Sequence, residues 1–321
     1  MGNRLDTQGR PQRVTRRPVH GLLLLDKPLG LSSNQALQKA KWLLRAEKAG
    51  HTGTLDPLAS GVLPLCFGAA TKFSQLHLDA DKTYQAVAQL GIATTTGDAE
   101  GDVLQRLPVA LDQAAVDRVR DRFVGLIRQT PPMHSALKKD GKPLYEYARA
   151  GIEVERAERE VTIHGLTLVL EQSADAASLH MQVRCSKGTY IRTLAQDIGA
   201  ALGCGAHLTF LRRVETGGFS LDKCVTLEQL EAMDDDQRLA QLRPVSDLLD
   251  GHVPVTLEAQ DAGRFLSGVR RRGVWPDNPR AAVFADAPRA LLGTAHVRAG
   301  ELIPDRLLSP IEIEQTLPGH P

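Results

Sequence analysis

The sequence predicts an α+β protein with a small β-rich domain at its C-terminal end. Segments that alternate apolar and polar residues, as half-buried strands do, are interspersed with segments of helical spacing through about residue 230. From Val253 onward, short apolar stretches lie between glycines and prolines, which is typical of a small β-barrel. We therefore predict a domain at 21–250 and a second at 251–321, with an acidic linker around 236–251.

Composition indicates an ordinary globular protein. Of 321 residues, 42% are hydrophobic and 24% charged, so the chain can build a large core. Lys+Arg 39 against Asp+Glu 38 gives a net charge of +1, so an RNA-binding surface would require local segregation of charge. No apolar run approaches the roughly 18–20 residues of a membrane span. The run at 22–25 is too short for a signal peptide, and we expect a cytoplasmic protein.

Two further features of composition concern the cysteines and the first 20 residues. The four cysteines have no zinc-site spacing and are expected to be reduced thiols. Three of them lie in apolar surroundings and are expected to pack as small hydrophobes. They are Cys66, Cys185 and Cys204, with Cys224 as the fourth. Residues 1–20 carry five arginines and no apolar core, which predicts a disordered basic tail.

The first predicted elements are a buried strand and a helix. Residues 21–26 are apolar up to Asp26, and Pro28 and Gly30 then turn the chain. Ser32 with Gln35 three residues later fits a capping box. Apolar residues at helical spacing follow through residue 44. Lys27, at the end of the strand, is interpreted as a structural residue.

The stretch 51–72, HTGTLDPLASGVLPLCFGAATK, contains a single carboxylate, Asp56. Pro57 disfavours the α-region for Asp56 and makes its backbone extended. A stiffened loop with one acid, and with His51 five residues upstream, fits the presentation of one group to a substrate. A turn-capping role for Asp56 explains the same spacing about equally well.

The middle of the chain predicts a strand, a polar loop and a helix. Within 82–91, Tyr84, Ala86, Ala88 and Leu90 alternate with more polar positions, so Tyr84 is expected on the buried face. Core packing alone would explain Tyr84. The run TTTGDAEGD (94–102) reads as a loop, and helical spacing resumes from 116 to 123.

Residues 131–160 mix cations with aromatic residues. Asp140-Gly141 between short extended pieces predicts a hairpin, and Pro143 and Gly151 bracket a short helix. Cations near aromatic rings suit phosphate contact and base stacking. The cations are Lys138, Lys139, Lys142 and Arg149, interleaved with Tyr145 and Tyr147. A solvated hairpin is the alternative interpretation.

Two alternating strands, 161–168 and 179–185, precede a helix at about 190–202 that Gly203 ends. Arg192 lies in the first turn of this helix, where the helix dipole does not favour a cation. It is therefore expected to meet a carboxylate or a phosphate. A further strand around 208–211 is followed by the Arg212-Arg213 pair, and Thr226 with Gln229 forms a second capping box.

Several stretches together carry a family resemblance. They are LLLLDKPLGLSS (22–33), the run at 51–72, KTYQAVAQLG (82–91), PPMHSALKKDGKPLYEYARAGIEV (131–154), CSKGTYIRTLAQDIG (185–199) and LGCGAHLTFLRR (202–213). The chain resembles the bacterial TruB family of tRNA pseudouridine synthases, which act on uridine 55 of the T-loop. The likeness covers Gly21 to about Thr226. His134 departs from it, since the family pattern leads us to expect tyrosine there.

The resemblance implies a fold and an activity. The fold would be that of pseudouridine synthases, a large mixed, mainly antiparallel sheet flanked by helices, with a C-terminal PUA-like barrel. The activity would isomerise a flipped uridine of the tRNA T-arm, with no cofactor and no metal. Asp56 would act on the nucleoside, through a covalent adduct or a glycal, and these alternatives stay open. We expect a monomer.

The resemblance also implies roles for individual residues. Arg192 would pair with Asp56 and keep it ionised. Tyr84 would stack under the base and could accept a proton. Tyr190 and Leu211 would line the pocket, and His51 would lie beside the flipped nucleotide. The insertion 131–160 would grip RNA through its four cations together with Arg212, and Arg270, Arg271 and Arg272 would be phosphate contacts of the PUA-like domain.

Three other functions are compatible with parts of the sequence. A non-catalytic RNA-binding or RNA-folding protein would use the same basic hairpin and C-terminal barrel. A guide-dependent synthase is disfavoured because 131–160 supplies the chain with an RNA grip of its own. A glycosidase would need a pair of carboxylates, and no second acid stands out near Asp56.

Overall fold

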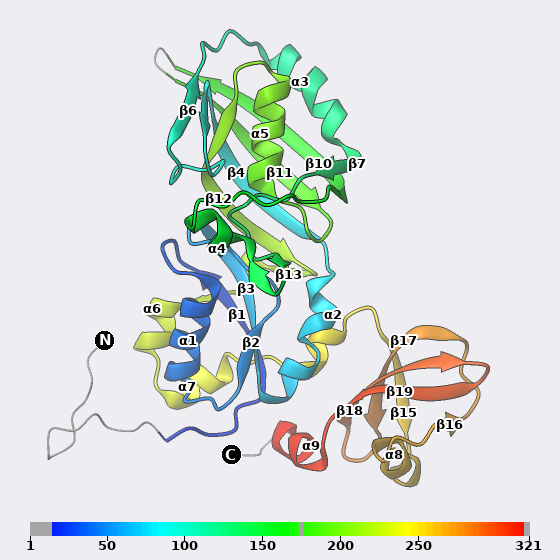
Figure 1. Cartoon of the computed structure of the whole chain (residues 1–321). Coiled ribbons are helices and arrows are strands. Elements are labelled where there is room, and N and C mark those ends of the chain that lie inside the picture. Colours follow the sequence, from blue (N-terminus) through cyan, green and yellow to red (C-terminus); the bar gives the residue numbers. More distant parts are fainter. Residues whose placement is uncertain (1–14, 174–175, 318–321) are drawn as a thin grey trace, which may run out of the picture. The chain divides into compact units, whose positions relative to one another are not determined.

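The computed structural model describes residues 15–173 and 176–317 (Figure 1). The chain forms two compact units. The first contains the chain up to Asp56, Leu63–Leu78 and everything from Lys223, and the second contains Pro57–Val62 and Asp79–Asp222. Asp56 is thus the last residue of a segment of the first unit, and its neighbour Pro57 opens the second.

The second unit is built on a mixed sheet. In spatial order its strands are β3 (Ala59–Phe67, of which the part up to Val62 belongs here), β12 (Ala206–Thr216), β4 (Lys82–Leu90), β11 (Ala177–Cys185), β10 (Arg159–Gln172) and β7 (Gly125–Gln129). The β3–β12 pair is parallel and the other pairs are antiparallel. The short strand β13 (Phe219–Ser220) also pairs with β12. The predicted mixed, mainly antiparallel sheet is confirmed.

Burial along β4 follows the predicted alternation. Tyr84, Ala86, Ala88 and Leu90 are buried, whereas Gln85 is exposed. Two helices flank this sheet: α3 (Gln113–Arg120) packs on β10, and α5 (Ile191–Ala201) packs on β12 and β4 (Figure 1). The turn between β5 (Ile92–Thr94) and β6 (Val103–Arg106) holds the polar run TTTGDAEGD. The sequence expectations for these elements are confirmed.

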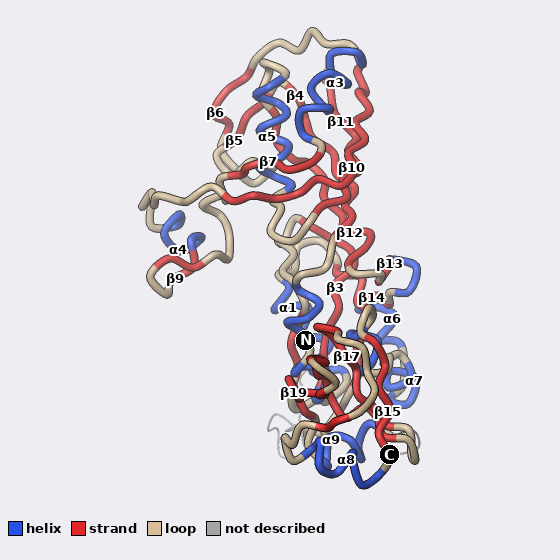
Figure 2. Tube along the Cα trace, turned by 90° about the vertical axis from the view of Figure 1, so that its right-hand side faces the viewer, coloured by secondary structure: helices blue, strands red, loops and turns tan. Residues whose placement is uncertain are grey.

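An insertion leaves the sheet after β7 and returns at β10 (Figure 2). Its hairpin pairs β8 (Lys138–Lys139) with β9 (Lys142–Pro143). Asp140 and Gly141 have φ of 52° and 80°, as a type I′ turn requires. The short helix α4 (Leu144–Arg149) follows, with Pro143 as its N-cap. The predicted hairpin and short helix are confirmed.

The first unit places its N-terminal elements around β1 (Gly21–Lys27). This strand, whose four leucines are buried, runs parallel to β14 (Val225–Thr226). Helix α1 (Ser33–Leu43) starts at the predicted Ser32–Gln35 capping box, and α6 (Leu227–Ala232) starts at the predicted Thr226–Gln229 box. Strand β2 (Ala49–His51) pairs antiparallel with the end of β3. The short helices η1 (Gly68–Lys72) and α2 (Ser74–Leu78) follow β3.

Two expectations about irregular segments are corrected. The predicted disordered tail lies partly outside the described residues, but 15–20 is ordered: the Arg17 amide donates to the Arg45 carbonyl at 2.8 Å, and Val19 is buried. The predicted linker at 236–251 is also packed. It contains part of α7 (Asp235–Ala240) and the helix η4 (Val245–Leu249), which buries Leu248 and Leu249. A few apolar residues inside an acidic stretch are enough to anchor it to the core.

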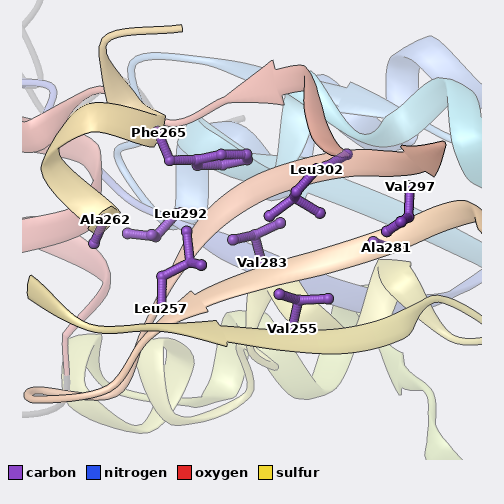
Figure 3. Packing of buried hydrophobic residues seen from close by; sticks show 10 residues of the cluster. Val255, Leu257, Ala262, Phe265, Ala281, Val283, Leu292, Val297 and Leu302 are labelled. Carbon is purple, nitrogen blue, oxygen red and sulfur yellow. The ribbon is translucent and has the colours of Figure 1, made fainter. Parts of the chain in front are cut away.

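The C-terminal part of the first unit is a five-stranded sheet with its own core (Figure 3). The order is β15 (Val253–Leu257), β17 (Asn278–Ala285), β18 (Ala290–Arg298), β19 (Glu301–Leu307) and β16 (Arg271–Arg272). Phe265 of α8 (Ala259–Leu266) is fully buried against this sheet. Lys72 donates to the Leu307 carbonyl and contacts Glu312 of α9 (Pro310–Thr316) at 2.6 Å. The predicted β-rich C-terminal fold is confirmed.

Within the described part of the chain, no helix has the length and apolar character needed to cross a membrane.

Candidate active site

Asp56 lies in the loop that connects β2 to β3. The loop starts where the Thr52 amide donates to the Pro64 carbonyl at 3.1 Å, and the Leu55 side chain anchors it in the interior with 4% exposure. Asp56 itself is half-buried, and Pro57 is exposed. His51, on β2 opposite Leu65, is also half-buried. The loop therefore carries a partly accessible carboxylate next to an anchored residue.

Tyr84 and Leu211 lie on neighbouring strands of the second unit. In the β12–β4 pair Leu211 lies opposite Ala86, and Arg213 lies opposite Tyr84. Residues directly opposite each other share a face of an antiparallel pair, so Tyr84 and Leu211 are diagonal neighbours on one face. Leu211 also pairs with Ala59 at the start of β3. The structure thus brings together two of the predicted pocket residues.

Arg192 has the acidic partner that its place in the first turn of α5 predicts. Its guanidinium lies 3.3 Å from the Asp98 carboxylate, with side-chain exposures of 7% and 9%. It also donates to the carbonyl of Thr96 at 3.4 Å and to that of His134 at 2.6 Å. Arg192 therefore joins α5 both to the 94–102 turn and to the base of the insertion.

The sequence interpretation missed Asp98. In the run TTTGDAEGD it looks like a turn residue, yet its carbonyl accepts from Thr94 and its carboxylate accepts from Thr96 and from the Glu100 amide. These bonds fix the carboxylate in place for Arg192. The one available signal was the demand of Arg192 for an anion, which points to no particular partner in the sequence.

Tyr190 is held by a second residue that sequence reasoning missed. Tyr190 is the N-cap of α5, and its amide donates to the Gln129 side chain at 3.0 Å. The same side chain donates back to the Tyr190 carbonyl at 3.2 Å, and Gln129 is 2% exposed. Because both backbone groups of Tyr190 are fixed, the position of Tyr190 depends on the last residue of β7.

Two cations are buried near one end of the β12–β4 pair of the same sheet. Arg213 is 1% exposed, and its Nε donates to the Val62 carbonyl at 2.8 Å. Lys82, two residues before Tyr84 on its buried face, is 8% exposed and donates to the Ala80 carbonyl. Burial, followed by the charge of Arg213, lowers the pKa of the Lys82 ammonium to about 8. Loss of water contact and repulsion both disfavour its charged form.

We expect this lowered pKa to make stability depend on pH. Between pH 8 and about 10.4, the unfolded chain keeps a proton on Lys82 that the folded protein releases, so the free energy of unfolding should rise with pH in this window. Over this pH window, the free energy of unfolding of the wild type should rise by about 2–3 kcal/mol more than that of Lys82→Met. Urea unfolding at closely spaced pH values measures the difference. Lys187→Met, which removes an exposed lysine, is the control. If the free energy of unfolding depends on pH equally in Lys82→Met and Lys187→Met, the lowered pKa of Lys82 is contradicted.

The predicted RNA-binding cations divide into exposed and structurally engaged ones. Lys138 is exposed, whereas Lys139 donates to the Glu155 carbonyl at 2.9 Å. Lys142 lies 4.9 Å from the Tyr147 ring centre, and Arg149 lies 5.4 Å from that of Tyr145. Each of these rings thus has a cation over one face, so positive charge and aromatic surface are adjacent in this part of the insertion.

The remaining arginine candidates have protein partners. Arg212 donates to the Ser60 hydroxyl at 3.1 Å, next to the start of β3. In the C-terminal sheet, Arg270 and Arg272 both contact Glu301, and Arg271 contacts Asp261. Hydrogen bonds from Arg272 and Arg270 lower the pKa of the Glu301 carboxyl. The triple-arginine run is therefore partly neutralised in the structure.

The cysteines behave as expected from the sequence. Cys66, Cys185 and Cys204 are buried, and none of the four forms a disulfide. Burial raises the pKa of the Cys66 thiol to about 12 and that of Cys185 to about 11, so neither is a thiolate at neutral pH. Across 15–173 and 176–317, no group of three or more His, Cys, Asp and Glu residues is arranged to hold a metal ion.

The predicted site residues thus fall into two sets. Asp56 and His51 belong to the first unit, and Tyr84, Tyr190, Arg192 and Leu211 belong to the second. Within the second unit, Tyr84 lies beside Leu211, and Tyr190 directly precedes the helix that carries Arg192. The pairing of Asp56 with Arg192 stays a prediction.

Family profiles and individual proteins are similar to most of the chain. Residues 41–191 match a profile described as TruB family pseudouridylate synthase (N terminal domain). Residues 192–250 match tRNA pseudouridylate synthase B C-terminal domain. A protein named tRNA pseudouridine synthase B from Verminephrobacter eiseniae is 64% identical over 96% of this chain and 95% of its own. A relative of the same name from Cupriavidus taiwanensis is 60% identical over 93% and 97%.

Solved structures share the fold at low identity. A chain in the crystal structure of a Cbf5-Nop10-Gar1 complex has a TM-score of 0.68 at 23% identity, covering 97% of this chain and 91% of that one. A chain in an H/ACA RNP bound to a substrate RNA containing 2′-deoxyuridine has a TM-score of 0.66 at 21% identity, covering 95% and 90%. These similarities support the pseudouridine-synthase fold.

Proposed function

The chain belongs to the TruB family of pseudouridylate synthases, and we propose that it isomerises uridine 55 in the T-loop of tRNA with Asp56 as its nucleophile. The reaction breaks the bond from ribose to the base nitrogen and remakes it to a ring carbon. That carbon loses a proton, and the freed nitrogen takes one up. Atoms and oxidation state are conserved. The proposal therefore requires only a carboxylate beside the ribose, a pocket for the detached base and a proton acceptor.

The observation that carries the proposal is the short length of chain between Asp56 and the start of β3. Ala59 pairs with Leu211, which lies beside Tyr84, and Asp56 precedes Ala59 by only three residues. Three residues of extended chain span at most about 10 Å. This short chain connection supports the proposed role of Asp56.

The roles of the other residues follow from their chemistry. Tyr84 would stack under the detached base and Leu211 would pack against it, because both side chains share one sheet face. Arg192 would keep Asp56 ionised and oriented, while Asp98 fixes the position of Arg192. Tyr190 would line the pocket, and His51, on the strand before the catalytic loop, would lie beside the flipped nucleotide.

The insertion and the C-terminal sheet would bind the tRNA. Lys138, Lys139 and Lys142 lie on the β8–β9 hairpin. Arg149 lies on α4 together with two exposed or half-buried tyrosines, and Arg212 lies near β3. We assign the C-terminal residues 251–321 an RNA-binding role of PUA type. We also propose that the protein acts as a monomer in the cytoplasm, without a bound metal.

The function is tested with the purified chain and a T-arm stem–loop transcript. The transcript carries tritium on the uracil ring carbon that becomes bonded to ribose, so isomerisation releases tritium to water. We expect release from the T-loop uridine and, by mass mapping of the RNA, pseudouridine at that position. A transcript with cytidine at that position is the control. Binding without tritium release would favour the non-catalytic RNA-folding alternative.

Removing one exposed cation of the insertion should weaken RNA binding in a salt-dependent way. We expect Lys138→Gln to raise Kd for the T-arm and to reduce the slope of log K against log salt by about 0.7–0.9, the loss of one phosphate contact. The control is Arg120→Gln, because Arg120 is ion-paired with Asp117 and Asp121 on α3. Equal slopes for Lys138→Gln and the wild type would exclude Lys138 as a phosphate contact.

A further inference from the structure

The hydroxyl of Ser33 holds both backbone groups of Leu55. The Leu55 amide donates to the Ser33 Oγ at 2.7 Å, and the Ser33 hydroxyl donates to the Leu55 carbonyl at 3.0 Å. Ser33 is 2% exposed and Leu55 is 4% exposed, so these bonds are shielded from water. A hydroxyl can fill both roles because it has one donor and two acceptor sites.

These two bonds fix the direction from which the chain enters Asp56. The peptide group is planar, so the Leu55 carbonyl and the Asp56 amide lie in one rigid plane. The bond to the Leu55 amide fixes the peptide plane between residues 54 and 55, and the bond to the Leu55 carbonyl fixes the plane between residues 55 and 56. The two soft torsions of Leu55 are then determined. On the other side, Pro57 restricts the backbone of Asp56 to extended geometry.

The serine is itself held by the fold. Ser33 is the first residue of α1, and Ala36, Leu37, Ala40 and Leu43 bury one face of that helix. The turn before the helix is closed by Lys27, whose ammonium donates to the carbonyls of Pro28 and Leu31 at 2.8 and 2.6 Å. The Ser33 hydroxyl therefore transfers the rigidity of α1 to the loop that carries the carboxylate.

We propose that Ser33 is a positioning residue for Asp56, 23 residues away in sequence, and that it raises the rate of the chemical step by fixing the Leu55–Asp56 peptide. The inference rests on the proposed function, in which Asp56 attacks the nucleoside. A misplacement of about 1 Å at a reacting group can cost about 10²-fold in rate. Ser33 does not touch the RNA in this role, so binding should not depend on it.

The test compares three variants of the full-length protein under single-turnover conditions, which separate chemistry from product release. We expect Ser33→Ala to lower the rate constant for tritium release by about 10- to 100-fold and to change Kd for the T-arm by less than about twofold. Ser33→Thr keeps a hydroxyl and should restore most of the rate. Thr226→Ala removes the side-chain cap of α6, is expected to destabilise the unit, and should keep the wild-type rate constant.

Each outcome decides one question. If Ser33→Ala keeps the wild-type rate, if Ser33→Thr is as slow as Ser33→Ala, or if Thr226→Ala slows the step as much, Ser33 is not a positioning residue. If Kd rises in parallel with the loss of rate, the serine acts on RNA binding instead. A wild-type protein that releases no tritium, or an Asp56→Asn variant that releases it normally, would overturn the proposed function itself.

Discussion

Replacing Asp56 with asparagine is expected to lower the rate of pseudouridine formation by more than about 10³-fold. Asparagine keeps the size of the side chain but removes the charge and the nucleophilic oxygen, and loss of a nucleophile typically costs several orders of magnitude. Asp56 is half-buried between an anchored residue and Pro57, so the loop should keep its course. Single-turnover tritium release from a T-arm transcript measures the rate.

Binding separates this prediction from the alternative of an RNA-folding protein. The variant should bind the transcript with a Kd within about twofold of the wild type, because the insertion cations are unchanged. Asp117→Asn, on α3, removes a carboxylate that pairs with Arg120 and should keep full activity. Turnover retained in Asp56→Asn would exclude this carboxylate as the catalytic group.

Local features of the fold could be predicted because they depend on neighbours in sequence. The Ser32–Gln35 capping box, the Asp140-Gly141 turn and the alternation around Tyr84 are each set within a few residues. Arg192 shows the limit of such reasoning. Its position at a helix N-terminus predicts an anion, and one anion that it contacts is Asp98, 94 residues earlier in the chain.

The contacts that support the candidate site also join residues that are far apart in sequence. Gln129 holds Tyr190 across 61 residues, and Ser33 holds Leu55 across 22. In the sequence, neither residue type nor spacing distinguishes Gln129 or Ser33 from other polar residues. Their roles depend on backbone groups distant in the sequence that only the fold brings next to their side chains. The proposed catalytic role of the stretch around Asp56 depends on its resemblance to a family.

Replacing Arg192 with methionine is expected to lower the free energy of unfolding by about 3–5 kcal/mol. Methionine fills similar space but leaves the Asp98 carboxylate, whose side chain is 9% exposed, without its cation. An unpaired buried charge is far costlier than the pair, and the bonds to the Thr96 and His134 carbonyls are lost as well. Urea unfolding followed by circular dichroism measures the change.

A double variant tests whether the buried pair is the cause. Adding Asp98→Asn to Arg192→Met removes the stranded charge, so it should restore part of the lost stability, and the two changes should be non-additive by more than about 0.5 kcal/mol. Arg120→Met removes an arginine from an exposed ion pair on α3 and should cost less than about 1 kcal/mol. If Arg192→Met costs no more than Arg120→Met, the buried pair does not stabilise the fold.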